Sequence, residues 1–270
     1  MNTEKTESSA KKDWRLEDLT LADVRQLAPQ LAVLPMGATE PHNLHLPYGT
    51  DTIEAGCLAD RCCEKAQQLG ARVIQLPVIP YGTETNMREL PLAMNLNPST
   101  LAAILTDLID TLEKNGILKL LILNSHGGND FKPFLREMYG KTKVQLFLCN
   151  WYQMISDVGE SIFDEPEDHA GEMETSLILS FRPELVAITS DGRLTADEGA
   201  RRPLAFKALQ EGWVSMTRPW HLLTTNSGSG NPHAASVEKG QQVTEAIVNR
   251  IAPFLHELAE AEIDSDFPFA

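Results

Sequence analysis

The amino-acid sequence predicts an α/β fold, with three α/β/α layers around a mostly parallel sheet. Short, continuous apolar runs bounded by glycine, proline or asparagine are typical of fully buried strands. Longer amphipathic segments, with apolar side chains at helical spacing, separate these runs. Strands that alternate with helices form right-handed βαβ units. Such units place parallel strands in one sheet and helices on both of its faces.

Four apolar runs are predicted as strands, at residues 31–36, 72–76, 118–123 and 144–148. Helices are predicted at residues 51–69, 98–114, 131–139, 169–181 and 234–260. Pro98 suits the first turn of its helix, where a missing N–H costs little, and Gly70 suits a helix C-terminus. Asp51 stands at the expected N-cap of the first helix.

The remaining segments are harder to predict. Residues 77–97 form a long connection with three prolines, and connections of that kind in a compact domain usually cover a site or carry a function. Residues 190–225 are expected to hold a small antiparallel addition or an oligomer contact. The domain organisation predicted is a disordered tail at 1–13, one domain at 14–260 and an acidic C-terminal tail at 261–270.

Composition excludes some classes of partner. The chain has 23 lysines and arginines against 38 aspartates and glutamates, a formal net charge of −15. Such an acidic surface repels phosphate backbones, so we expect no nucleic acid. No apolar run approaches the ~20 residues that cross a bilayer, so no membrane is expected. Four cysteines without a CxxC pair, and an N-terminus without an apolar signal segment, favour reduced thiols and a cytoplasmic location.

A first group of candidate metal ligands follows the first predicted strand. Glu40 and His42 are two residues apart, so in an extended loop both side chains face the same way. Asp51 follows at the mouth of the same loop, where open α/β sheets bind ligands. Two carboxylates and an imidazole suit Zn²⁺, Mn²⁺ or Fe²⁺, and an aspartate placed here can bridge two cations. The alternative is that Asp51 only caps its helix and the other two are ordinary loop residues.

A second group follows the strand predicted at 118–123, which runs directly into Asn124-Ser125-His126-Gly127-Gly128-Asn129. His126 is therefore expected at the carboxyl edge of the sheet. The two glycines allow the backbone to approach a ligand closely. The alternative is a glycine-rich turn with an uninvolved histidine.

A third group opens the helix predicted at 169–181. Glu174 is a candidate metal ligand from the first turns of this helix, and His169 is placed to reach a substrate from the helix start. The two are five residues apart, so they share a helical face less well than His169 and Glu172, which are three apart. The alternative is an acidic first turn that complements the helix dipole.

Together these motifs resemble the creatininase family, also called creatinine amidohydrolase-like proteins. The matching pieces are residues 36–42, 45–47, 49–51, 124–129 and 169–176, with a weaker match at 231–240. The resemblance spans about residues 14–255. It implies a three-layer α/β fold with a parallel sheet, two divalent metal ions per subunit and a homo-oligomer, often a hexamer.

The resemblance also implies roles for individual residues. Glu40, His42, Asp51 and His126 match metal ligands, with Asp51 bridging. Creatininase itself has a further ligand, a glutamate two residues after the strand-end histidine, where this chain has Gly128. That departure makes Glu174 the candidate for the remaining carboxylate, and it disfavours creatinine as the substrate.

The expected activity is hydrolysis of a non-peptide or cyclic amide C–N bond in a small molecule, by a hydroxide that two metal ions (Zn, Mn or Fe) activate. His169 is the expected general acid for the leaving nitrogen, and Asp168 is expected to orient it or to bind substrate. Backbone N–H groups of Gly127 and Gly128 are candidate oxyanion donors. Further candidates for substrate contact are Trp151, His45 and Glu172.

Other functions stay open at this point. Within the same family they are a formamide deformylase and a peptide-processing metallopeptidase. A non-catalytic protein that holds a small amide on its metal is another. A serine hydrolase is disfavoured because the sequence has no Gly-x-Ser-x-Gly elbow.

Overall fold

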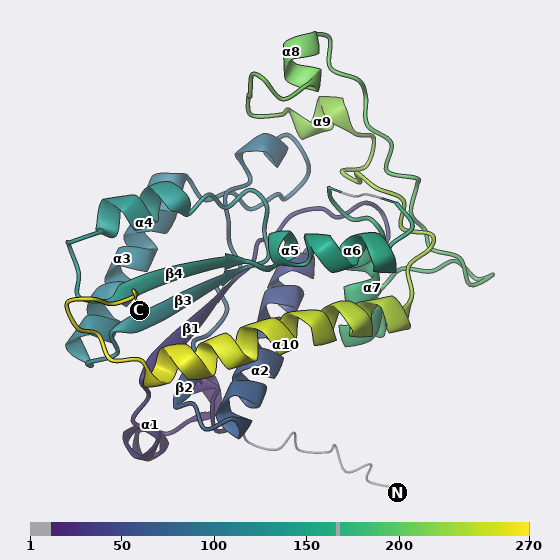
Figure 1. Cartoon of the computed structure of the whole chain (residues 1–270). Helices are drawn as coiled ribbons and strands as arrows, with labels where there is room; N and C mark the ends of the chain where they lie inside the picture. The colour runs from purple at the N-terminus through teal and green to yellow at the C-terminus, as the bar shows by residue number, and fades with distance from the viewer. Residues whose placement is uncertain (1–11, 166–167, 270) are drawn as a thin grey trace, which may run out of the picture.

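The computed structural model describes residues 12–165 and 168–269. Residues 1–11 of the predicted N-terminal tail lie outside this part. The centre is a parallel sheet in the order β2-β1-β3-β4 (Figure 1). Its strands are β1 (Leu31–Met36), β2 (Val73–Gln75), β3 (Lys119–Asn124) and β4 (Gln145–Asn150). The prediction of a mostly parallel sheet is confirmed.

Helices cover both faces of the sheet, which gives the three predicted layers (Figure 1). One face carries α2 (Thr50–Gln68), α7 (Glu172–Phe181) and α10 (Val237–Glu260); the other carries α3 (Pro98–Lys114) and α4 (Lys132–Met138). Side chains of β1 alternate between the two cores, with Leu31 and Val33 on the α2 side and Ala32 and Leu34 on the α3 side. The apolar runs are continuous because both faces are buried.

Shorter elements connect and extend this framework. They are η1 (Leu16–Asp18), α1 (Leu21–Leu27), η2 (Thr85–Met87), α5 (Trp151–Met154), α6 (Ser156–Ile162), η3 (Pro183–Leu185), α8 (Lys207–Gln210) and α9 (Trp220–Leu223). Figure 1 shows α8 and α9 on a projection that stands away from the sheet. Within residues 190–225 the predicted antiparallel addition amounts to isolated bridges, such as Arg201 with Thr224.

Two helix starts differ from the prediction. Helix α2 begins at Thr50 with Gly49 as N-cap, so Asp51 lies inside the first turn and is not the cap. The Thr50 hydroxyl and N–H both donate to the Pro47 carbonyl, which starts the helix one residue early. Helix α7 begins at Glu172. Its expected first residue, His169, instead pairs in extended backbone with Ser229.

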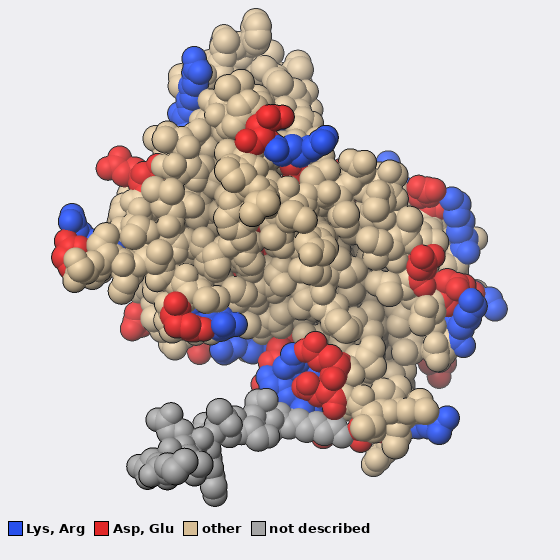
Figure 2. Space-filling model, turned by 180° about the vertical axis from the view of Figure 1, so that it is seen from behind, with Lys and Arg blue, Asp and Glu red and all other residues tan. Residues whose placement is uncertain are grey.

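The C-terminal segment packs on the sheet, and the surface carries charge of both signs. In the predicted acidic tail, the Phe267 ring packs edge-on against Phe147, 6.3 Å between centroids. No helix among the described residues is long and apolar enough to cross a membrane. On the face seen in Figure 2, charged side chains of both signs gather at the margins and the middle carries few of them. The negative charge is therefore not concentrated in the middle of that face.

Candidate metal centre

The carboxyl ends of the two central strands bring the first two motifs together. Strands β1 and β3 are hydrogen-bonded neighbours, and Met36 pairs in register with Asn124. The loops that carry Glu40 and His126 therefore leave the sheet side by side at the same edge. The short distance between motifs remote in sequence follows from parallel pairing alone.

One candidate cation position lies between Glu40, Asp51 and His126. Nδ1 of His126 is 3.1 Å from Oε1 of Glu40 and 3.2 Å from Oδ2 of Asp51. One ligand atom from each residue lies within 4.8 Å of the others, and all three residues are buried. Two carboxylates and one imidazole are a donor set suited to a divalent transition metal.

A second candidate position lies between His42, Asp51 and Glu174. Nε2 of His42 is 3.3 Å from Oδ1 of Asp51 and 3.8 Å from Oε2 of Glu174. The first position uses Oδ2 of Asp51 and the second uses Oδ1. The Asp51 carboxylate therefore presents one oxygen to each position, which is the geometry of a bridging ligand.

Backbone and side-chain hydrogen bonds orient the two ligand histidines. Nδ1 of His42 lies 3.0 Å from the Glu40 carbonyl oxygen, so a proton there leaves Nε2 free to face the centre. Nε2 of His126 lies 3.2 Å from the Thr83 carbonyl oxygen, which leaves its Nδ1 for a cation. A ligand histidine normally donates its other ring N–H to such an acceptor, which fixes ring and tautomer.

The centre contains buried atoms that fit a cation. Nε2 of His42 and Oε2 of Glu40 make no hydrogen bond to any residue that the structure describes. Leaving a buried polar atom unsatisfied costs about 1–3 kcal/mol, and more when the group is charged. A divalent cation facing Nε2 of His42 would give this nitrogen a partner, so the residues present fit a metal centre.

The pKa shifts of the cluster also fit a bound cation. Burial opposes charge on the His42 imidazole, but the carboxylates of Asp51, Glu174 and Glu40 outweigh it and raise the pKa of His42 to about 10. Burial raises the pKa of Glu174 to about 7 and that of Glu40 well above its usual value. The buried carboxylates thus favour positive charge on His42, and bound cations would supply positive charge at the same place.

His169 lies against this cluster. Its Nδ1 is 3.7 Å from Oε1 of Glu40, its ring lies 4.1 Å from the His42 ring, and its Nε2 is 2.9 Å from the Pro41 carbonyl oxygen. Donation from Nε2 to that carbonyl leaves Nδ1 facing the centre. Burial, with the nearby charge of His42, lowers the pKa of His169 well below its usual value. The geometry also allows it to join Glu40 and His42 around a cation.

An open cleft of about 770 Å³ gives access to the centre. Candidate site residues on its surface are Glu40, Asp51, His126, Gly127, Gly128, Asp168, His169 and Glu174. The long connection contributes Thr83, Thr85, Asn86, Met87 and Asn97; the start of α3 contributes Pro98 and Ser99; and the projection contributes Met216, Thr217, Arg218 and Trp220. The predicted covering role of residues 77–97 agrees with this placement.

A family model described as creatinine amidohydrolase matches residues 17–255. The chain belongs to the creatininase family. The members compared with it are hydrolases by name, and the prediction of a hydrolase of this family is confirmed.

Several relatives show the breadth of the family. A solved structure of a putative creatinine amidohydrolase from Bacteroides fragilis NCTC 9343 is 35% identical, with a TM-score of 0.86 over 94% of this chain and 99% of that one. Creatinine amidohydrolase of Pseudomonas putida is 26% identical over 83% of this chain and 88% of its own length. Mycofactocin precursor peptide peptidase of Mycobacterium ulcerans is 25% identical over 80% and 81%. A manganese creatininase structure, 22% identical over 93% and 100%, shares the fold with a TM-score of 0.72.

Gly128, the departure from creatininase, has a steric cause in this family member. A Cβ atom at Gly128 would lie 2.3 Å from Nε2 of His126 and 2.4 Å from the Thr83 carbonyl oxygen. No side chain, and therefore no glutamate ligand, fits there. A Cβ at Gly127 would meet nothing within 4 Å. Both glycines line the cleft, as predicted.

Asp168 lies in the cleft but does not contact the His169 ring in the way expected of an orienting residue. Its carboxylate accepts a hydrogen bond of 2.7 Å from Arg218 and lies 3.6 Å from Arg201. The Pro41 carbonyl takes the orienting role at His169 instead. Asp168 therefore borders the cleft as part of an ion pair.

Two residues expected to contact substrate are used in the interior instead. Trp151 is buried in the core on the α2 side of the sheet, and its Nε1–H donates to the Ser125 hydroxyl at 2.6 Å. His45 is buried and hydrogen-bonded through Nε2 to the Thr175 hydroxyl, at 2.7 Å. Neither is among the described residues that line the cleft. Trp151 supports the loop that carries Ser125 and His126, and His45 joins the first motif loop to α7.

Glu172 is also placed away from the cleft. Its carboxylate accepts a hydrogen bond from the Asp164 N–H, at 2.8 Å, and pairs with Lys239 of α10. It therefore ties the start of α7 to α10. Glu174, two residues further along α7, lies with His42 and Asp51 at the second candidate cation position.

Sequence reasoning missed Glu84. This residue lies in the connection at 77–97, is completely buried, and places Oε1 3.0 Å from Nε2 of His126. The available signal was an acidic residue inside a long connection expected to cover a site. No spacing relative to His126 could have linked the two.

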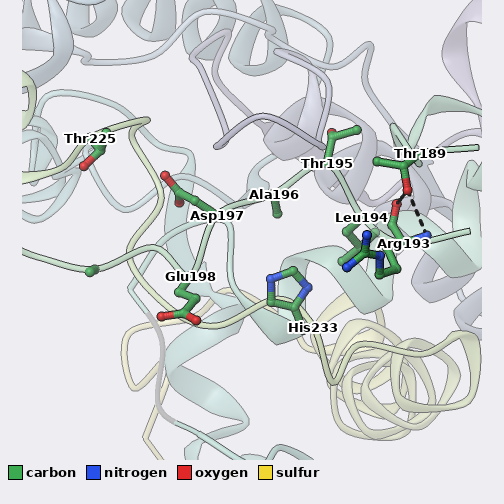
Figure 3. Close-up of a pocket in the computed structure, with 10 residues that line it drawn as sticks. Thr189, Arg193, Leu194, Thr195, Ala196, Asp197, Glu198, Thr225 and His233 are labelled. Atoms are coloured by element: carbon green, nitrogen blue, oxygen red, sulfur yellow. Dashed lines mark hydrogen bonds between the residues drawn. The ribbon is translucent and has the colours of Figure 1, made fainter. Parts of the chain in front are cut away.

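A separate pocket of about 640 Å³ lies elsewhere on the surface (Figure 3). It is lined by Thr189, Arg193, Leu194, Thr195, Ala196, Asp197, Glu198, Ala200, Thr225 and His233. None of the predicted metal ligands is among these described residues. Two of its charged side chains have partners, because Arg193 pairs with Asp191 and Asp197 accepts from Asn226.

Proposed function

We propose that the chain is a metal-dependent hydrolase of an amide C–N bond in a small non-peptide or cyclic amide, with two divalent cations per subunit. One observation carries this proposal. The two oxygens of Asp51 face two different histidines, at 3.3 and 3.2 Å, and each histidine has a further carboxylate beside it. Glu40, Asp51 and His126 would hold one cation, and His42, Asp51 and Glu174 the other.

Bound divalent cations of Zn, Mn or Fe type would supply Lewis acidity, both to activate water and to polarise the amide carbonyl. The chain supplies the rest of the site. Burial of the ligands excludes bulk water and strengthens the electrostatic interactions. The N–H groups of Gly127 and Gly128, on the cleft surface, are candidate donors to the substrate oxygen.

His169 is the proposed catalytic proton carrier. With Nε2–H held by the Pro41 carbonyl, its Nδ1 faces the reacting centre with a free lone pair. Nδ1 would accept a proton during attack and then donate it to the leaving nitrogen. The second of these transfers is the general acid step expected from the sequence, and such a residue contributes roughly 10²–10⁴-fold.

A second candidate, peptide processing, is favoured by the size of the accessible space. A depression of about 500 Å³ adjoins the cleft and shares Asp168 and Arg218 with it. A single-ring amide would occupy only part of the combined space, whereas a short peptide or a larger formamide could extend across the ion pair. A relative named as a peptidase supports this second candidate.

Metal analysis and a substrate panel test the proposal. We expect two equivalents of divalent metal per chain, loss of activity with a chelator and recovery on adding Zn²⁺ or Mn²⁺. Cyclic amides, formamides and short peptides would be compared by kcat/KM. A chain without metal, or activity that persists after complete metal removal, would contradict the proposed function. Cleavage of the peptides alone would select the second candidate.

Two further properties belong to the proposal: assembly as a homo-oligomer, a hexamer by family resemblance, and a cytoplasmic location. Free cysteines agree with a reducing compartment. The projection exposes Phe206, Trp213 and Val214, by 70%, 71% and 55%. Several exposed large apolar side chains within one short segment agree with an interaction surface there. Light scattering that gave a monomer mass would contradict the oligomer.

A further inference from the structure

Glu84 is a fully buried acidic side chain in the long connection at residues 77–97. A buried carboxylate persists only when a specific partner stabilises it. Its Oε1 lies 3.0 Å from Nε2 of His126, on the ring edge opposite the Nδ1 that faces the first cation position. Glu84 is not among the described residues that line the cleft.

The surrounding connection holds Glu84 at this place. The Glu84 N–H donates to Oδ1 of Asn95 at 2.8 Å, and the Thr83 N–H donates to Oδ1 of Asn129 at 3.0 Å. Asn129 belongs to the motif that carries His126. The bond from Thr83 to the Asn129 side chain therefore joins the connection to the motif that carries His126, and the bond to Asn95 fixes Glu84 within the connection.

Close packing leaves little room for other arrangements. An added Cβ at Gly82 would lie 3.1 Å from Oε1 of Glu84, and one at Gly128 would lie 2.3 Å from Nε2 of His126. Both glycines therefore leave space for the pair. At Gly128, where creatininase has a ligand glutamate, no side chain fits. The Glu84 carboxylate instead approaches His126 from the connection, at the ring nitrogen that faces away from the cation position.

We infer that Glu84 is a positioning residue that acts through His126 on one of the two cations. This inference rests on the proposed function. The Thr83 carbonyl oxygen accepts the Nε2–H of His126, and the Glu84 carboxylate lies 3.0 Å from the same nitrogen, so both favour the tautomer with a free Nδ1. Its negative charge makes the imidazole a stronger ligand. Loss of such an outer carboxylate typically weakens metal affinity or activity by 10–100-fold.

The test compares Glu84→Gln with Glu89→Gln, which changes an exposed acid in the same connection. Glutamine keeps the shape and an acceptor oxygen but removes the charge. Affinity for Zn²⁺ is measured by competition with a chromophoric chelator, the Co²⁺ absorption spectrum reports ligand geometry, and melting is followed with and without Zn²⁺. We expect Glu84→Gln to weaken one of two Zn²⁺ equivalents by about 10–100-fold and to alter the Co²⁺ spectrum. Glu89→Gln should match the wild type.

The outcomes separate the two proposals. A wild-type chain that binds no divalent metal overturns the proposed function and this inference with it. A wild-type chain that binds two cations, with unchanged affinities and spectrum in Glu84→Gln, overturns the role of Glu84 alone. If Glu84→Gln lowers the melting temperature without Zn²⁺ but leaves the Zn²⁺-induced increase unchanged, Glu84 is purely structural and the inference fails.

Discussion

The floor of the cleft, formed by the loops that carry the candidate metal ligands, and the projection that carries α8 and α9 are built in opposite ways. On the floor, Glu40, His42 and Asp51 are at most 1% exposed and are held by strand ends and hydrogen bonds. The projection, which carries α8 and α9, exposes most of its large apolar side chains and consists of short helices and isolated bridges (Figure 1). It is anchored by a small cluster in which Trp220 and Leu223 pack on Met87.

This difference suggests a division of tasks. A rigid, buried floor suits chemistry, because ligand atoms must keep their positions within narrow limits. A thinly anchored projection can vary in sequence without disturbing those atoms, and its Thr217 and Arg218 face the same cleft. We therefore expect floor substitutions to remove metal or turnover, and projection substitutions to change stability or substrate binding.

The largest effect is expected from Asp51→Asn. The substitution keeps the volume but weakens the one carboxylate that both cation positions share. Both equivalents of metal and several orders of magnitude in activity should be lost, since activation of water depends on the cations. Elemental analysis and kcat/KM provide the measurement. Asp60→Asn, on the same helix but paired with Trp14 and Lys12, is the control. An Asp51→Asn variant that retained both metal ions would show that Asp51 does not bridge the two cation positions.

His169→Ala should retain both cations and lower kcat by roughly 10²–10⁴-fold, as expected for loss of a proton-transferring group. Metal content and kcat are measured on the same preparation. His221→Ala, at an exposed position on α9, is the control. Normal turnover would reject the catalytic role. Loss of a metal equivalent would show that His169 is a ligand instead, which its distance from Glu40 allows.

Two tryptophans sharpen the comparison within the projection. Trp220 is 3% exposed and contacts the His169 ring edge-on at 5.0 Å, whereas Trp213 is 71% exposed. Trp220→Ala should cost about 3–5 kcal/mol and raise KM, because it empties the anchoring cluster beside the cleft. Trp213→Ala should stay within about 0.5 kcal/mol in an isolated subunit. Urea unfolding measures both, and equal losses would contradict the proposed anchoring.

The adjacent glycines of the floor provide the smallest and most local comparison. Gly128→Ala places a methyl group against His126 and Thr83, so we expect a loss of about 1–3 kcal/mol and lower metal affinity. Gly127→Ala points into open space and should change stability by less than about 0.5 kcal/mol. Thermal melting and chelator competition measure the two variants. Similar values for both would show that the backbone here adjusts easily.

Much of the floor was predictable because parallel strands end at one edge of a sheet. The apolar run at residues 31–36 became β1 with the predicted bounds, and the residues that follow it supply Glu40 and His42. His126 was predictable by the same argument from β3. The starts of α2 and α7 were displaced because turn hydrogen bonds at Pro47 and the pairing of His169 with Ser229 decided them locally.

By itself, the sequence determined which side chains reach the carboxyl edge of the sheet, because burial on both faces and the strand–helix alternation depend on local pattern. Only the tertiary structure decided which atoms meet there. Glu84 against His126, Pro41 against His169 and the Arg218 pair with Asp168 all join loops far apart in the chain. Such contacts depend on loop conformation and packing between elements, which have no period in the sequence.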